Sequence, residues 1–119
     1  MSTGRFARHQ RLLSSSDFRH VFAQPRRLSH PHLMMLIRSN QKPYARLGLA
    51  IPKRHIRLAV DRNRIKRQIR ESFRTRQTKL VGWDIVVMAR SGAARLSNRE
   101  LREVLESHWQ RLATECADS

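Results

Sequence analysis

Residues 59–74 read AVDRNRIKRQIRESFR and combine the densest positive charge of the chain with the periodicity of a helix. Ile65, Ile69 and Phe73 recur four residues apart, so they share one helical face, with Ser72 beside them. Asp61 is a favourable N-cap residue, and the pattern predicts a helix over 62–76 with one narrow apolar stripe. Because so many like charges on one short helix repel one another, we expect a polyanion outside the protein to neutralise them.

The basic side chains of this helix fall on both flanks of the apolar stripe. They are Arg62, Lys66 and Arg70 on one ridge, and Arg64, Arg67 and Arg74 toward the other. Arg predominates, and its guanidinium matches two phosphate oxygens at once, which favours a shaped polyanion. Asn63 suits a ribose hydroxyl, a base edge or the bracing of a neighbouring Arg, and these roles stay open. A merely solvated face would mix signs, whereas Glu71 is the single acid within 62–76.

The whole chain is as basic as this helix suggests. Its 119 residues hold 25 Lys and Arg against nine acids, a formal net charge of +16. The excess lies within residues 1–79, whereas residues 97–119 carry three Arg and five acids. The length suits one core, so we expect a single RNA-binding domain over 1–119.

The sequence lacks the features of a membrane protein and of a protein stabilised by disulfides. The longest apolar run, Ile85–Ala89, has only the length of a strand, so no membrane partner is expected. The basic start MSTGRFARHQR precedes no apolar stretch of the kind found in signal peptides, and we expect a cytoplasmic protein. Cys116 is the only cysteine, which excludes an internal disulfide and a thiolate zinc site made by this chain alone.

The remaining elements follow from local patterns. Residues 14–25 (SSSDFRHVFAQP) predict a short helix with Phe18, Val21 and Phe22 on one face. Residues 32–38 and 44–51 predict two antiparallel strands around a turn. Residues 84–90 (DIVVMAR) form a continuous apolar run, which is typical of a central strand covered on both faces.

The last helix has the clearest start signal. Ser97 and Glu100 form a capping box, Leu96 and Leu101 a hydrophobic staple, and His108 falls on the apolar face of the helix that follows. The element order is helix, two or three strands, helix, strand, helix. We therefore predict an α+β fold, a small two-layer sandwich with helices packed on a small sheet.

No arrangement of residues indicates a protein active site. Asp17, Asp61, Glu71 and Asp84 are scattered, without the spacing of a metal-binding or acid–base pair, so no catalytic residue is predicted. The histidines of the HPH sequence at 30–32 are expected to be structural or solvated, as is His108, and no metal site is predicted on the protein. Trp83 and Trp109 are expected to be packing residues.

The sequence resembles the protein subunit of bacterial ribonuclease P. The resemblance is carried by RNRIKRQIRESFR (62–74), preceded by LGLAIPKR (47–54) and followed by WDIVVMAR (83–90). Residues 11–37 resemble the N-terminal helix and first strand of that family, and residues 96–112 resemble its last helix. Residues 52–61 (PKRHIRLAVD) lack the usual Ser-Lys-Lys start and the Gly turn. The resemblance covers nearly the whole chain in order.

This resemblance implies a fold detail and a function. The basic helix would lie in a left-handed β-α-β crossover, against the general rule for such connections. The family's protein would act as a monomer within a ribonucleoprotein, where a catalytic RNA binds Mg²⁺ and hydrolyses precursor tRNA to release its 5′ leader. The protein would support the RNA fold and bind the leader, without carrying the chemistry itself.

The resemblance also assigns residues to two surfaces. The catalytic RNA would contact Arg62, Asn63, Arg64, Lys66, Arg67, Arg70, Lys53 and Arg54. The precursor tRNA leader would contact Phe18, Phe22, Tyr44 and Arg46, where aromatic edges and cations grip an unpaired strand.

Two other classes share part of this pattern. A structural RNA-binding protein, such as a ribosomal component, would have the same charge and a similar small α+β form. A DNA-binding module would also use a basic helix, but it needs a helix-turn-helix partner or dimerising heptads, and the sequence shows neither.

Overall fold

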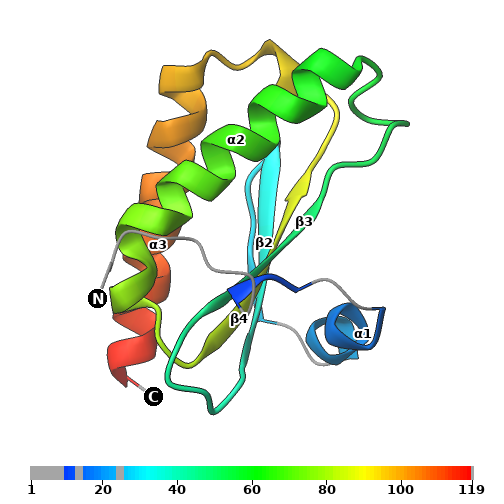
Figure 1. Ribbon diagram of the computed structural model, residues 1–119. Coiled ribbons are helices and arrows are strands. Elements are labelled where there is room, and N and C mark those ends of the chain that lie inside the picture. The colour runs from blue at the N-terminus through cyan, green and yellow to red at the C-terminus, as the bar shows by residue number, and fades with distance from the viewer. Residues whose placement is uncertain (1–9, 13–14, 24–25, 119) are drawn as a thin grey trace.

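The computed structural model describes residues 10–12, 15–23 and 26–118, and it confirms the α+β class. Figure 1 shows the order of the elements. They are α1 (Ser15–Ala23), β1 (Arg26–Leu28), β2 (Leu33–Ser39), β3 (Arg46–Ala50), α2 (Ala59–Arg76), β4 (Trp83–Ala89) and α3 (Asn98–Asp118), with short 3₁₀ turns η2 (Gln77–Lys79) and η3 (Ala93–Arg95). The sequence predicted two or three strands before the basic helix, and the structure has three, of which β1 is the additional one.

The four strands form one sheet in the order β1-β2-β4-β3. β4 pairs antiparallel with β2 and parallel with β3, so the prediction of a central strand at 84–90 is confirmed. β2 and β3 run antiparallel, as predicted, but they are not neighbours, because β4 lies between them. Five successive residues of β4, from Trp83 to Val87, are buried, since both of its long edges are paired and both faces are covered.

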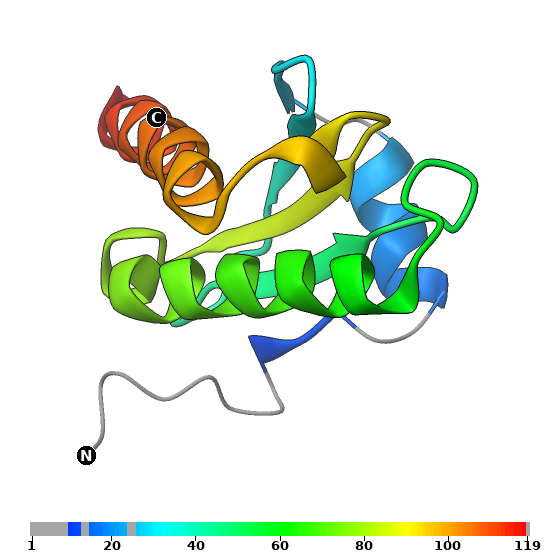
Figure 2. The ribbon, with the colours of Figure 1, turned by 90° about the horizontal axis from the view of Figure 1, so that it is seen from above.

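α2 forms the crossover between β3 and β4 and packs with α3 on one face of the sheet (Figure 2). Ile65, Ile69 and Phe73 are fully buried there, as predicted. Ser72 accepts a 2.7 Å hydrogen bond from Nε1 of Trp109, whose ring meets Phe73 edge to face. The polar residue beside the stripe therefore joins the two helices. The left hand of the crossover stays a prediction from the resemblance.

α1 covers part of the opposite face of the sheet. Val21 is fully buried against Met34, Leu36 and Val86, and Phe18 packs beside this smaller cluster. The helix predicted in 14–25 is thus confirmed, and each face of the sheet has its own apolar cluster.

The two long helices begin differently. The predicted Asp61 cap of α2 is wrong: the helix begins at Ala59 after Leu58, and the backbone N–H groups of Asp61 and Arg62 both donate to the Leu58 carbonyl oxygen. Asp61 lies inside the first turn, where its carboxylate is favourable to the helix dipole.

At α3 the predicted capping box is confirmed. The Ser97 N–H donates to Glu100 at 3.0 Å, and the Glu100 N–H donates to Oγ of Ser97 at 3.1 Å. Hydrogen bonds to the Glu100 carboxylate from the backbone N–H and the side chain of Ser97 lower the pKa of Glu100.

Within the described part of the chain, none of the helices has the length and apolar character needed to cross a membrane.

Candidate nucleic-acid interface

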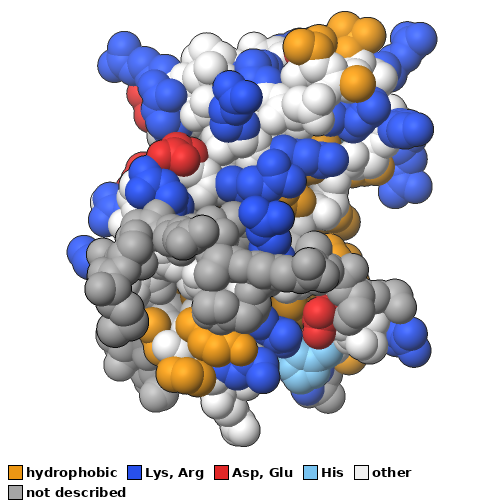
Figure 3. Space-filling model, in the orientation of Figure 1, with side chains coloured by type: hydrophobic (Ala, Val, Ile, Leu, Met, Phe, Trp, Pro, Cys, Tyr) orange, Lys and Arg blue, Asp and Glu red, His pale blue; other side chains and the backbone are white. Residues whose placement is uncertain are grey.

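The outer surface of α2 is a band of positive charge. Figure 3 shows Lys and Arg side chains along this helix and around its N-terminal end, with a few acidic side chains toward α3. Asn63, Arg67 and Arg70 are exposed, and Lys66 is half-buried. Because the apolar stripe faces the sheet, these predicted RNA-binding residues are presented to solvent on the opposite side or along its flank.

Arg62 and Arg64 are engaged within the protein. Nη1 of Arg62 donates to the carbonyl oxygens of Ile56 and Arg57, at 3.0 and 2.9 Å. The guanidinium of Arg64 donates to carbonyl oxygens of the segment before α3, on Ala94 and Leu96, and to the Asn98 side chain. The first arginine therefore fastens the turn before α2, and the second fastens α2 to the start of α3.

Lys53 and Arg54 lie in the turn after β3, and both are exposed. The turn is held by backbone bonds from His55 and Ile56 to the Pro52 carbonyl oxygen, as well as by Arg62. The structure thus brings these two cations to the N-terminal end of the basic helix.

A hollow of about 290 Å³ lies beside this surface. It is lined by Arg11, Leu12, Phe18, Leu47, Gly48, Leu49, Lys66 and Arg70. Phe18 was assigned to the leader and the two α2 cations to the catalytic RNA, so one hollow joins residues from both predicted sets. Phe22 is 42% exposed and stacks on Phe18, with ring centroids 6.3 Å apart.

Gly48 allows Phe18 to approach β3 closely. A Cβ atom at this position would lie 2.9 Å from Cζ of Phe18 and 3.0 Å from Cβ of Leu12. Contacts under 3.0 Å require a shift, so any side chain here would push the Phe18 ring away from the strand. The absence of a side chain at residue 48 therefore sets the position of the aromatic wall.

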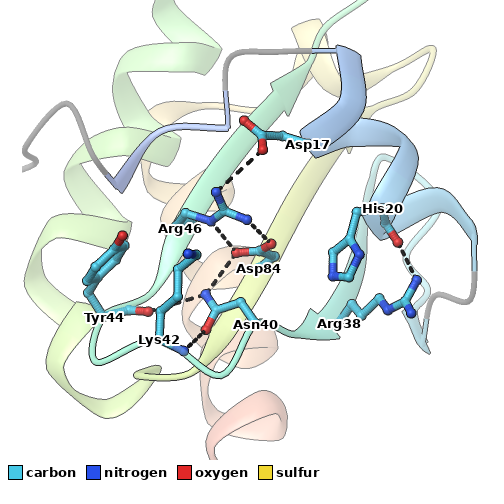
Figure 4. Close-up of polar contacts among 8 residues, drawn as sticks. All are labelled: Asp17, His20, Arg38, Asn40, Lys42, Tyr44, Arg46 and Asp84. Atoms are coloured by element: carbon cyan, nitrogen blue, oxygen red, sulfur yellow. Dashed lines mark hydrogen bonds and ion pairs between the residues drawn. The ribbon is translucent and has the colours of Figure 1, made fainter.

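Arg46 is held by two carboxylates rather than presented to solvent (Figure 4). Its Nε and Nη2 donate to the two oxygens of Asp84 at 2.7 and 2.6 Å, and its Nη1 lies 3.4 Å from Asp17 of α1. Asp84 is fully buried and also accepts from the Asn40 amide at 2.8 Å. The hydrogen bond to Asp84 raises the pKa of Arg46. This residue therefore ties α1 to the sheet.

The two other predicted leader residues differ in their surroundings. Tyr44 is half-buried just before β3, and Phe22 lies on the exposed side of α1. Neither lines the hollow that contains Phe18.

Sequence reasoning missed Asp84, Asp17, Arg11 and Gly48. The signal for Asp84 was present, because an acid at the head of a buried strand needs a cation partner. Its partner Arg46 is 38 residues earlier, and only the pairing of β3 with β4 brings the two together.

A buried histidine, His108 of α3, lies beside the half-buried His30. His108 is 2% exposed and its Nε2 lies 2.9 Å from the Leu33 carbonyl oxygen, while the His30 ring lies 6.0 Å away. Burial lowers the pKa of both residues. Among the side chains that the structure describes, no three of His, Cys, Asp or Glu are placed to hold a metal ion.

A small α+β frame with a basic helix beside a hollow lined by Phe18 is typical of the class of RNA-binding proteins. A family model described as Ribonuclease P matches residues 6–113. The chain belongs to the ribonuclease P protein family.

Its relatives agree with this membership. The chain is 50% identical to the ribonuclease P protein component of Ectopseudomonas mendocina over 91% of this chain and 81% of that one. It is 46% identical to the component of Nitrosococcus oceani, over 96% of each chain. Among solved structures, the RNase P protein of Staphylococcus aureus superposes with a TM-score of 0.79 at 28% identity, covering 87% of this chain and 94% of that one. That of Thermotoga maritima gives 0.75 at 31% identity, covering 85% and 96%.

Membership makes the chain a protein component of ribonuclease P, an RNA-binding protein of tRNA processing. It also implies a partnership with the RNA of that ribonucleoprotein.

Proposed function

We propose that this protein binds the catalytic RNA of ribonuclease P through the outer surface of α2 and the 53–54 turn, and the 5′ leader of precursor tRNA at the neighbouring hollow. In this proposal the RNA carries out the hydrolysis that gives the mature tRNA 5′ end. The observation that carries the proposal is the shared lining of the hollow by Phe18, Lys66 and Arg70.

The hollow has the chemistry of a single-strand site. A ring such as Phe18 stacks on any base, and cations such as Lys66 and Arg70 hold the backbone phosphates on either side. Stacking of this kind is tolerant of sequence, which suits leaders that differ between tRNAs. We expect Arg46 to act on the leader indirectly, because its guanidinium is bonded to Asp84 and Asp17 and so fixes α1.

The α2 surface has the chemistry of a phosphate contact. Counterion release from about six phosphates would weaken binding roughly a thousandfold between dilute and physiological salt. Arg67 and Arg70 are exposed and suited to this contact. Arg64 would contribute mainly by holding α2 against the segment before α3, since its guanidinium is bonded to that segment.

We further propose that Mg²⁺ is held chiefly by the RNA subunit and that the protein acts as a monomer in the cytoplasm. Among the described residues no acid lines the hollow, and the carboxylates of Asp17 and Asp84 are bonded to Arg46. Because a basic surface also screens the repulsion between RNA phosphates, the benefit of the protein should be greatest at low Mg²⁺.

The test is cleavage of a 5′-extended precursor tRNA by a bacterial ribonuclease P RNA at low and high Mg²⁺, with and without the protein. We expect stimulation at low Mg²⁺ that is lost in Arg67→Gln/Arg70→Gln. The matched control is Arg99→Gln/Arg102→Gln, which removes two exposed charges from α3 instead.

Equal stimulation at both Mg²⁺ concentrations would contradict the screening argument. Equal loss in both double variants would mean that net charge matters and the α2 surface does not. A protein that binds this RNA no better than an unrelated folded RNA and leaves cleavage unchanged would favour the alternative, a structural RNA-binding protein.

A further inference from the structure

The N-terminal end of α2 carries an exposed apolar pair. Leu58 is 62% exposed and Val60 is 70% exposed, and they are two of the four large apolar side chains with high exposure in the described ranges. Figure 3 shows hydrophobic side chains gathered over this end of the helix, between Lys and Arg side chains. The pair adjoins the surface that we assign to the catalytic RNA.

Neither residue stabilises the N-terminal end of α2. Leu58 occupies the N-cap position, where Ser, Thr, Asp or Asn would accept a bond from the first turn, and it makes no side-chain cap bond. Val60 is β-branched and lies in the first turn, where a straight side chain would be favoured at an exposed position. Residues that break local rules without a gain in packing are expected at functional sites.

The charges around the pair indicate its partner. Lys53, Arg54 and Arg57 are exposed in the preceding turn. Asp61, which is half-buried, is the single acid in residues 52–70. A second copy of this chain would bring the same cations face to face, and their repulsion opposes self-association. A partner with phosphates beside an apolar surface is complementary, and an unpaired nucleotide, whose base exposes a flat face, has both.

We propose that Leu58 and Val60 pack against an unpaired nucleotide of the catalytic RNA, while Lys53, Arg54 and Arg57 hold the phosphates on either side. This inference rests on the proposed function and deepens it, because it adds an apolar contact to a surface otherwise defined by charge. The exposed Asn63, one turn further along α2, continues the same surface.

The apolar contact and the phosphate contacts respond differently to salt. Loss of a phosphate contact lowers the slope of log affinity against log salt concentration by roughly 0.7 to 0.9. Loss of an apolar contact weakens binding at every salt concentration and leaves that slope unchanged. The two kinds of contact are therefore separable in one titration.

The experiment measures binding of the full chain to a bacterial ribonuclease P RNA at several KCl concentrations. For Leu58→Ser/Val60→Ser we expect affinity about tenfold lower at every KCl concentration, because two aliphatic side chains that the RNA would partly bury are lost. The slope of log affinity against log salt concentration should not change. Because serine at residue 58 supplies the missing cap, the melting temperature should not fall. Arg57→Gln should instead reduce the slope.

Two controls make the result specific. Leu58→Met/Val60→Ile keeps the apolar area and should bind like the wild type, which excludes a general effect of mutating the helix start. Val81→Ser changes an exposed apolar residue beyond the other end of α2 and should also leave affinity unchanged.

Affinity of the serine variant within about twofold of wild type would overturn the inference and leave the proposed function standing. Concentration-dependent dimers of the wild type that are lost in the serine variant would also overturn it, since the pair would then serve self-association. A wild-type protein that does not prefer the ribonuclease P RNA over an unrelated folded RNA would overturn both the inference and the proposed function.

Discussion

Removal of the Arg46 guanidinium should destabilise the protein strongly. In Arg46→Met the Asp84 carboxylate stays fully buried and keeps only the Asn40 amide among the side-chain partners described above. Breaking a buried ion pair from one side costs about 3 to 5 kcal/mol, because the remaining charge is desolvated without compensation. A domain of this size has a total stability of about 5 to 15 kcal/mol, so the loss is large.

The assay is urea unfolding followed by the fluorescence of Trp83 and Trp109, which are buried in the native state. The double variant Arg46→Met/Asp84→Leu should recover part of the loss, because no uncompensated charge remains. The control is Arg99→Met, which breaks an ion pair whose side chains are 84% and 66% exposed and should cost less than about 1 kcal/mol. If Arg46→Met costs no more than this control, or the double variant is as unstable as the sum of its parts, the reasoning is wrong.

Two further predictions concern the histidine cluster and the aromatic wall. Burial lowers the folded-state pKa of His108 and His30, so stability should be constant above the unfolded-state pKa of about 6.5 and fall as the pH drops below it. Urea unfolding at neutral and acidic pH should show this loss, and His108→Gln should reduce it. Gly48→Ala should push the Phe18 ring away from β3 and raise KM for a precursor tRNA with a long leader. A substrate with a one-nucleotide leader should be unaffected, and equal effects on both would place Gly48 outside leader binding.

Much of the fold could be predicted because its signals are local. The capping box of Ser97 and Glu100 needs only four consecutive residues, and the stripe of Ile65, Ile69 and Phe73 needs only one helix. The insertion of β4 between β2 and β3 could not be predicted from these patterns, because strand pairing joins segments far apart in the chain.

The start of α2 shows the limit of a local rule. Asp61 is a good N-cap residue, and the rule places the helix after it. The N-cap of the helix instead lies three residues earlier, at Leu58, a residue that caps poorly. Contacts of the preceding turn, including those of Arg62 with the Ile56 and Arg57 carbonyl oxygens, favour the longer helix and override the local preference.

The candidate site was predictable in its components and not in its arrangement. The basic helix and Phe18 follow from composition and periodicity, helped by the resemblance. That Lys66, Arg70 and Phe18 line one hollow depends on α1 and α2 both reaching the edge strand β3 from different faces of the sheet. Likewise, the resemblance placed Arg46 among the leader contacts, and only the structure shows that Asp84 and Asp17 engage its guanidinium.

The uneven charge of the two long helices gives the molecule an electric dipole. Residues 52–79, which include α2, hold eleven Lys and Arg and two acids, whereas residues 97–119, which include α3, hold more acids than bases. The negative potential around an RNA should orient such a molecule before contact, so that α2 faces the RNA and α3 faces away from it. A larger fraction of encounters then has the productive orientation, which raises the association rate constant. This rate constant should fall with added salt, because salt shortens the range of the electrostatic attraction.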